Sequence, residues 1–228
     1  GPDTEELIYE VLISEPGFML TGAPVLTSSS EGSVTVDWGD GTPQETFENR
    51  RPTHVYAQPG RYTVVMSGTA KSLEFGNGET YAPELQSVVS WGKMGYTTAA
   101  DMCLGCSSLK SIPNDVAGSF SAVKSFLGAF SCCLSLEEIP SGLFRYASVA
   151  KNFEDCFSHC GSISSIPEDL FAECKAAEDF TYTFYGTGSG VIVTTTLLAN
   201  FDEVRSLVSA GKLKEIPGGL FRNCPSVR

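Results

Sequence analysis

An internal repeat of about 27 residues constrains the fold of this 228-residue chain more than any other feature. The dipeptide Ile-Pro begins at Ile112, Ile139 and Ile166, at intervals of 27 residues, and again at Ile216, which lies 50 residues further on. One unit of this length cannot bury its own apolar face, whereas stacked units can cover each other. The repeat therefore predicts a stack of similar units over the greater part of the chain.

Each unit has two parts with different apolar patterns. The first part carries apolar residues at positions i, i+4 and i+7, a spacing that predicts an amphipathic helix. The second part ends at Ile-Pro and predicts a short strand followed by a turn. We expect Phe153 and Phe157 to lie buried on one helix face against these strands. The helical spacing occurs at Phe126, Phe130 and Cys133, at Phe153, Phe157 and Cys160, and at Phe180, Phe184 and Thr187.

The residues before the repeats predict a β-sandwich. Polar and apolar residues alternate from Ser33 to Trp38, and the run ends in Asp40-Gly41, a strong hairpin signal. A second alternating run over residues 61–66 follows the turn signal of residues 58–60. Short strands separated by turns in this way are typical of a sandwich. Because the alternation ends before residues 76–78, we expect a boundary near residue 78.

The sandwich region resembles the PKD domain, whose hallmark is a W-G-D-G turn followed by H-x-Y-x-x-P-G-x-Y-x-V. The matching residues are Val34–Thr42, His54–Tyr56 and residues 59–64. This resemblance implies an Ig-like sandwich over residues 2–78, of the kind that serves as a spacer or binding module on secreted and surface proteins.

The repeat region resembles the BspA-like leucine-rich repeats of bacterial surface proteins. The resemblance rests on the L-x-x-I-P-x-x-L-F units and on residues 90–92, Ser-Trp-Gly. It implies an α/β leucine-rich-repeat solenoid of about five repeats over residues 79–228. The expected protein is thus multidomain, a β-sandwich followed by an α/β solenoid.

The same resemblance implies a location and a class of function. Members of that family are secreted to the cell surface, often as lipoproteins, and several act in adhesion to host matrix or to other bacteria. We therefore expect a cell-surface protein, anchored to the outer membrane of a Gram-negative bacterium by a lipid anchor that lies outside this sequence.

The charge of the chain argues against two classes of partner. Its 27 acidic residues exceed its 15 basic residues, giving a net charge of −12, and no basic cluster occurs. Nucleic acids and anionic membranes normally bind to a positive face. We expect neither as a partner, and no apolar run approaches the length of about 18 residues that a membrane span requires.

The eight cysteines admit three interpretations. Cys103 and Cys106 form a C-x-x-C pair, a spacing also found in zinc sites. However, Cys106, Cys133 and Cys160 occupy one equivalent repeat position, which favours a ladder of small buried side chains. Adjacent rungs about 5 Å apart would approach disulfide range, although side-by-side pairing suits a disulfide poorly. We favour free thiols, and the disulfide alternative stays open.

The sequence does not suggest an enzyme, a cofactor or a metal site. It contains two histidines, His54 in the PKD-like motif and His159 in a predicted loop, and no nucleophile–base pair is indicated by their spacing. Asp37 and Asp40 flank a tight turn. We expect them to stabilise that turn rather than to bind calcium, which requires six to eight oxygen ligands.

Tyrosines at variable repeat positions are the candidate ligand-binding residues, because tyrosine is a frequent contact residue in recognition sites. We therefore expect an adhesion or interaction protein that binds a host-matrix or bacterial surface protein through the repeats. The alternative is a glycan-binding accessory protein, which a shared exposed platform of Tyr146, Tyr182 and Tyr185 would favour. The candidates are Tyr182, Tyr185, Tyr146 and Tyr96.

Overall fold

A computed structural model describes residues 5–76, 82–167 and 169–187. Seven strands form two antiparallel sheets, one of five strands in the order β4-β3-β6-β1-β7 and one of two strands, β2-β5. The elements are β1 (Leu7–Ile13), β2 (Phe18–Thr21), the 3₁₀ helix η1 (Ser29–Glu31), β3 (Gly32–Asp37), β4 (Glu45–Glu48), β5 (Thr53–Tyr56), β6 (Gly60–Ala70) and β7 (Leu85–Trp91).

The two sheets enclose the core of the predicted sandwich. Side chains alternate between buried and less buried along β1, as expected for a strand that packs through one face. Trp38, Phe47 and Tyr56 are fully buried between the sheets. Alternating sequence and turn chemistry therefore identified this part of the fold correctly.

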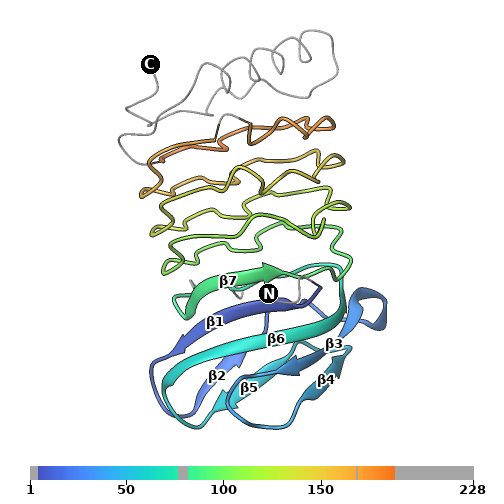
Figure 1. The fold of residues 1–228 in the computed structure, drawn as a ribbon, viewed down its shortest axis with the longest axis vertical. Helices are drawn as coiled ribbons and strands as arrows, with labels where there is room; N and C mark the ends of the chain where they lie inside the picture. Colours follow the sequence, from blue (N-terminus) through green and yellow to red (C-terminus); the bar gives the residue numbers. More distant parts are fainter. Residues whose placement is uncertain (1–4, 77–81, 168, 188–228) are drawn as a thin grey trace.

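The five-stranded sheet continues past residue 78, where we expected a boundary. Strand β7 pairs antiparallel with β1, with Leu7 opposite Trp91. Figure 1 shows the remaining described chain as flat layers stacked above β7. One cluster of buried apolar residues extends from the sandwich into these layers. The domain division itself stays a prediction.

The predicted α/β solenoid is wrong, because the described part of the repeats contains no α-helix. Alternate backbone amides of one layer donate to the next layer, as Phe126 N does to Asn152 O and Gly128 N does to Glu154 O. The intervening amides donate three residues back, as in Ala129 N to Phe126 O. A helix would instead direct every amide four residues back. These segments are therefore successive turns joined between layers.

Left-handed backbone conformations explain why the helical spacing misled. Two repeat positions, four residues apart, have positive φ in every described unit, and an α-helix cannot continue through such a residue. Successive turns nevertheless point a side chain into the core every three or four residues, and the resulting apolar spacing in the sequence is the same as that of a helix. The first position has φ of 57° at Asp101, 60° at Gly128, 54° at Asp155 and 54° at Tyr182; the second has 71° at Gly105, 59° at Cys132, 58° at His159 and 70° at Gly186.

Phenylalanine rings form the core of the layers. Phe153 and Phe157 are fully buried, as predicted, although they lie on turns. The ring of Phe157 stacks on Phe130 at 5.2 Å and on Phe184 at 5.7 Å between centroids. Phe153 likewise stacks on the equivalent rings one layer before and one layer after it. Each ring therefore contacts both neighbouring layers.

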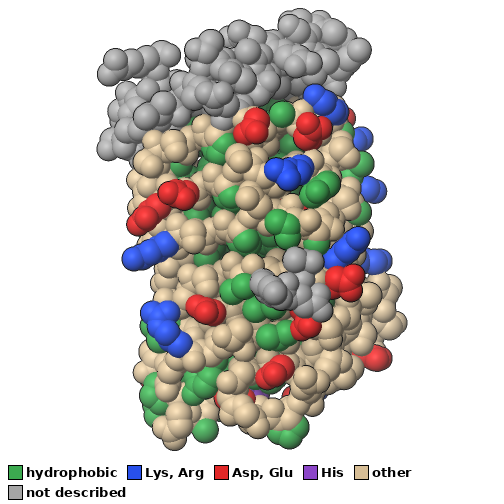
Figure 2. Space-filling model, viewed as in Figure 1, with side chains coloured by type: hydrophobic (Ala, Val, Ile, Leu, Met, Phe, Trp, Pro, Cys, Tyr) green, Lys and Arg blue, Asp and Glu red, His purple; other side chains and the backbone are tan. Residues whose placement is uncertain are grey.

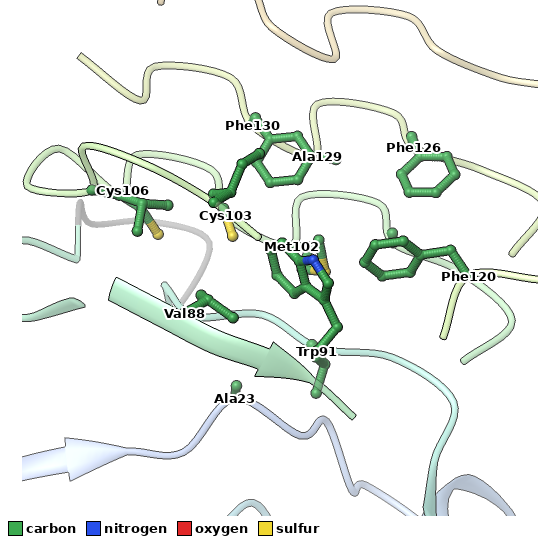
Figure 3. Close-up of a cluster of buried hydrophobic side chains, with 14 of the residues drawn as sticks. Ala23, Val88, Trp91, Met102, Cys103, Cys106, Phe120, Phe126, Ala129 and Phe130 are labelled. Atoms are coloured by element: carbon green, nitrogen blue, oxygen red, sulfur yellow. The ribbon is translucent and has the colours of Figure 1, made fainter. Parts of the chain in front are cut away.

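Trp91 joins the sandwich to the layers. It ends β7, and Figure 3 shows its side chain reaching into the cluster of side chains from the first layers. Its ring contacts Phe120 and Phe130, and its Nε1 donates to Pro113 O at 2.9 Å. Trp91 is 2% exposed, so its side chain covers the end of the core of the layers.

The cysteine ladder is buried as predicted. Cys106, Cys133 and Cys160 have no exposed surface. The thiol of Cys133 donates to Cys103 O at 3.2 Å, and the thiol of Cys160 repeats this bond one period later with Phe130 O at 3.0 Å. The seven cysteines within the described residues are free thiols. Burial raises the pKa of Cys156, so this thiol stays protonated.

Candidate functional site

A hollow at the edge of the last two described layers brings together four polar and aromatic side chains. Asp155 and His159 come from one layer, and Tyr182 and Tyr185 come from the next. The backbone fixes this pairing, since Asp155 N donates to Thr181 O at 3.0 Å and His159 N donates to Tyr185 O at 2.7 Å. The 27-residue period thereby places Tyr182 beside Asp155.

The aromatic rings meet edge to face. The rings of Tyr182 and Tyr185 lie 5.2 Å apart at 77°, and the rings of His159 and Tyr185 lie 5.3 Å apart at 88°. Tyr182 is 37% exposed. The three rings therefore form corners in which one ring's edge meets another ring's face, instead of a flat common surface.

Left-handed backbone places three of the four lining residues. Asp155, His159 and Tyr182 all have φ between 54° and 58°. Asp and His occur in this conformation more readily than most residues, but for a bulky residue such as Tyr182 it is a true outlier. Strain of this kind costs about 1–3 kcal/mol and gathers at functional sites. The strain at Tyr182 therefore supports a functional role for its ring.

The carboxylate of Asp155 lies in a partly dehydrated position. Burial raises the pKa of Asp155, against the opposing effects of a hydrogen bond with Ser158 and the charge of His159. The nearby carboxylate of Asp179 raises this pKa further. In the described part of the chain, no salt bridge includes Asp155 or Asp179. A cation could therefore enter the hollow without displacing a lysine or arginine of these residues.

The four predicted tyrosines do not form one surface. Tyr146 is 41% exposed but lies beside Gly118, on the loop that follows Phe144. Tyr96 is only 2% exposed, and its hydroxyl donates to Trp91 O at 2.5 Å. The expectation of an exposed contact residue at Tyr96 is therefore wrong, because its ring belongs to the core. Tyr182 and Tyr185 alone are brought together.

Two lining residues, Asp155 and His159, were not among the sequence candidates. The repeat alignment contained a signal for both, because Asp155 and Tyr182 are equivalent residues of adjacent units. His159 similarly shares its repeat position with Cys132 and Gly186. Equivalent residues of stacked units lie side by side. The neighbours of a residue in the adjacent layer are therefore the residues about 27 positions before and after it in the sequence.

The motif histidine of the sandwich has a structural role. His54 Nε2 lies 2.6 Å from Asp40 Oδ2, and the His54 ring stacks on Trp38 with centroids 5.1 Å apart. Although burial acts to raise the pKa of Asp40, hydrogen bonds from His54 and Thr42 lower it. Asp37 Oδ1 accepts a hydrogen bond from Gly39 N at 2.9 Å. The predicted stabilisation of this turn by Asp37 and Asp40 is confirmed.

Comparison with known proteins identifies the class of the N-terminal module. Residues 11–72 match the PKD domain, so the chain contains a PKD domain at this place. PKD domains are typically extracellular or surface-exposed adhesion-type modules. The comparisons lend no support to the BspA-like resemblance of the repeats. No curated protein and no solved structure matched the chain.

Figure 2 shows acidic and basic side chains interspersed over one face of the molecule. No helix within the described residues is long and apolar enough to cross a membrane.

Proposed function

We propose that this protein is an extracellular interaction protein that binds a protein partner through its stacked repeats. The hollow lined by Asp155, His159, Tyr182 and Tyr185 carries this proposal. Tyrosine offers a large apolar contact area together with a polar hydroxyl, which is why it is frequent at binding hot spots. The hollow combines two such residues with ionisable groups.

The ring geometry favours a protein partner over a glycan. Stacking on a sugar requires an exposed ring face, and a shared platform of three tyrosines would provide it. Tyr182 and Tyr185 instead meet at 77°, while Tyr146 lies on another loop. A corner of this kind suits a single protruding side chain better than a flat sugar ring.

The PKD domain would support the repeats in this function. Because β7 belongs to the five-stranded sheet and Trp91 packs against the layers, the sandwich forms a firm base for the stack. The proposal involves binding without turnover. It places the protein at the surface of a bacterial cell, which protease treatment of intact cells followed by immunodetection would test.

A binding panel tests the proposal. The purified protein would be screened against host-matrix proteins, bacterial surface proteins and a glycan array. The double variant Tyr182→Gly/Tyr185→Ala should lose most binding to the protein that the wild type recognises, whereas Tyr146→Ala should retain it. Recognition of glycans alone, or unchanged binding by the double variant, would count against the proposal.

A further inference from the structure

The hollow has the ingredients of a cation site. A cation bound between aromatic groups gains electrostatic attraction from ring faces, and a carboxylate nearby adds a full opposite charge. Tyr182 and Tyr185 provide two rings 5.2 Å apart, and Asp155 provides the carboxylate. Asp179, whose Oδ1 accepts from Thr181 N at 2.9 Å, adds a second negative charge nearby.

Lys151, which precedes Asp155 by four residues, is already paired. Lys151 Nζ lies 3.8 Å from Glu178 Oε1, whereas no lysine or arginine among the described residues forms a salt bridge with Asp155. Among the lining residues that the structure describes, His159 is the only one that can carry a positive charge. When His159 is neutral, the hollow is anionic and aromatic.

We propose that the hollow receives a basic side chain, lysine or arginine, from an exposed segment of the partner. The inference rests on the proposed binding function and specifies the chemistry of the partner. The alkyl part of that side chain would contact the ring of Tyr182, and its charged end would lie by the Asp155 carboxylate. This arrangement uses the aliphatic stem and the charged head of such residues together.

The chain contains a matched control for the carboxylate. Asp101 occupies the same repeat position as Asp155, has a similar φ of 57°, and burial raises its pKa as well. Its neighbour in the next layer is Gly128, where Asp155 has Tyr182. Both Asp155→Asn and Asp101→Asn therefore remove one negative charge. Asp155 lies beside the aromatic rings, whereas Asp101 lies beside a glycine. Asparagine also tolerates the left-handed backbone.

The experiment uses blocked pentapeptides of glycine with one central residue: lysine, arginine or Nε-acetyl-lysine. Binding would be followed in the full chain by the NMR signals of its two histidines. His159 lines the hollow, whereas His54 packs on Trp38 in the sandwich and reports nonspecific effects. The lysine and arginine peptides should shift the His159 signal and bind about tenfold more tightly than the acetylated peptide.

The variants separate a specific site from general attraction to an acidic protein. Asp155→Asn should weaken binding of the lysine peptide about tenfold, and Asp101→Asn should change it by less than about twofold. Tyr185→Phe should preserve binding because it keeps the ring. Equal binding of the acetylated peptide, or equal losses in the two Asn variants, would overturn the inference.

The two proposals can fail separately. A partner from the panel could bind in a way that depends on Tyr182 and Tyr185 but does not change when its lysines are acetylated and its arginines blocked. The binding function would then stand, and the proposal of a basic side chain in the hollow would be refuted. If no panel protein binds while the lysine peptide discriminates between Asp155→Asn and Asp101→Asn, the cation site stands without its proposed partner.

Discussion

Tyr182 combines the most strained backbone in the hollow with an exposed ring. The equivalent residues of the preceding units are Asp155, Gly128 and Asp101, all of types that tolerate positive φ. The left-handed backbone makes a tyrosine at this position costly in folding free energy, which motivates the proposal that its ring contributes to binding. This separates Tyr182 from the buried phenylalanines, whose contribution to packing is sufficient reason for their presence.

Replacing Tyr182 by glycine should leave the free energy of unfolding unchanged or slightly raised. Removing the strain stabilises the folded protein by about 1–3 kcal/mol. Losing the ring contact costs about 0.5–1.5 kcal/mol, and the greater conformational freedom of glycine in the unfolded chain costs more. Chemical denaturation would measure the change. Tyr185→Gly is the control, because Tyr185 lacks the positive φ and should lose stability. A loss above about 1 kcal/mol in Tyr182→Gly would show that the ring belongs to the core.

Asp155→Asn should stabilise the protein in a pH-dependent way. The folded protein raises the pKa of Asp155, so it binds this proton more tightly than the unfolded chain does. The ionised carboxylate therefore lowers stability above the folded-state pKa, and the penalty disappears below 3.8, the ordinary pKa of an aspartate in an unfolded chain. Melting curves should show a gain for the variant near neutral pH and no gain in acid. A gain of the same size at every pH would contradict this cause.

At the scale of elements, each layer depends on rings supplied by its neighbours. Phe157 lies between Phe130 and Phe184 and also contacts Phe144, which belongs to the preceding unit. Removing one such ring leaves a cavity that three layers share. The effect should therefore spread beyond the layer in which the substitution is made.

Phe157→Ala should lower the free energy of unfolding by about 3–5 kcal/mol. Thermal and chemical denaturation of the full chain would measure it. Val149→Ala provides a comparison, because Val149 is 42% exposed and should change stability by less than about 1 kcal/mol. A loss below about 1 kcal/mol for Phe157→Ala would indicate that the layers relax around the missing ring.

The sequence predicted which residues of the repeats are buried but not the backbone that buries them. The spacing of apolar residues indicates which side chains point into the core, not which backbone carries them. Successive turns point side chains into the core at nearly the same interval as a helix does. The positions with positive φ distinguish the two cases, but only five of their eight described members are glycine or aspartate, the types that indicate such a backbone: Gly105, Gly128, Gly186, Asp101 and Asp155. Cys132, His159 and Tyr182 concealed the pattern.

The candidate site was partly predictable for the same reason. Tyr182 and Tyr185 were identified as departures from the repeat, whereas Asp155 and His159 required the knowledge that equivalent residues lie side by side. Tyr96 was misplaced because nothing local in the sequence shows that its hydroxyl reaches Trp91 O. A contact with a distant segment also buries its ring, which lies 6.3 Å from the ring of Phe120.

Across the whole molecule, sandwich and layers share one buried core. The edge strand β7 follows the PKD domain in sequence but completes its sheet, and Gly92 next to it lies so close to Leu7 that a β-carbon would sit 2.7 Å from Leu7 N. Two units joined in this way should not unfold independently.

We therefore expect a single cooperative unfolding transition. The chain has two tryptophans, Trp38 in the sandwich and Trp91 at the junction, so Trp38→Phe and Trp91→Phe each leave one fluorescent reporter. Within each variant, tryptophan fluorescence and far-UV circular dichroism should give coincident denaturation midpoints. Separate midpoints for the two probes would show that the layers melt apart from the sandwich.

The hydrogen bonds between the described layers make this part of the chain tolerant of changes in length by whole units only. These bonds join residues 26 or 27 positions apart, as Phe126 N to Asn152 O and Lys151 N to Lys124 O. Excising or duplicating one complete unit leaves every remaining layer facing an equivalent layer. Gaining or losing a few residues within the turns shifts donors away from acceptors and moves inward-facing rings to the surface. Recombination between units would thus be a productive route for such a protein to vary its reach, while the residues at the edge of each layer vary what it recognises.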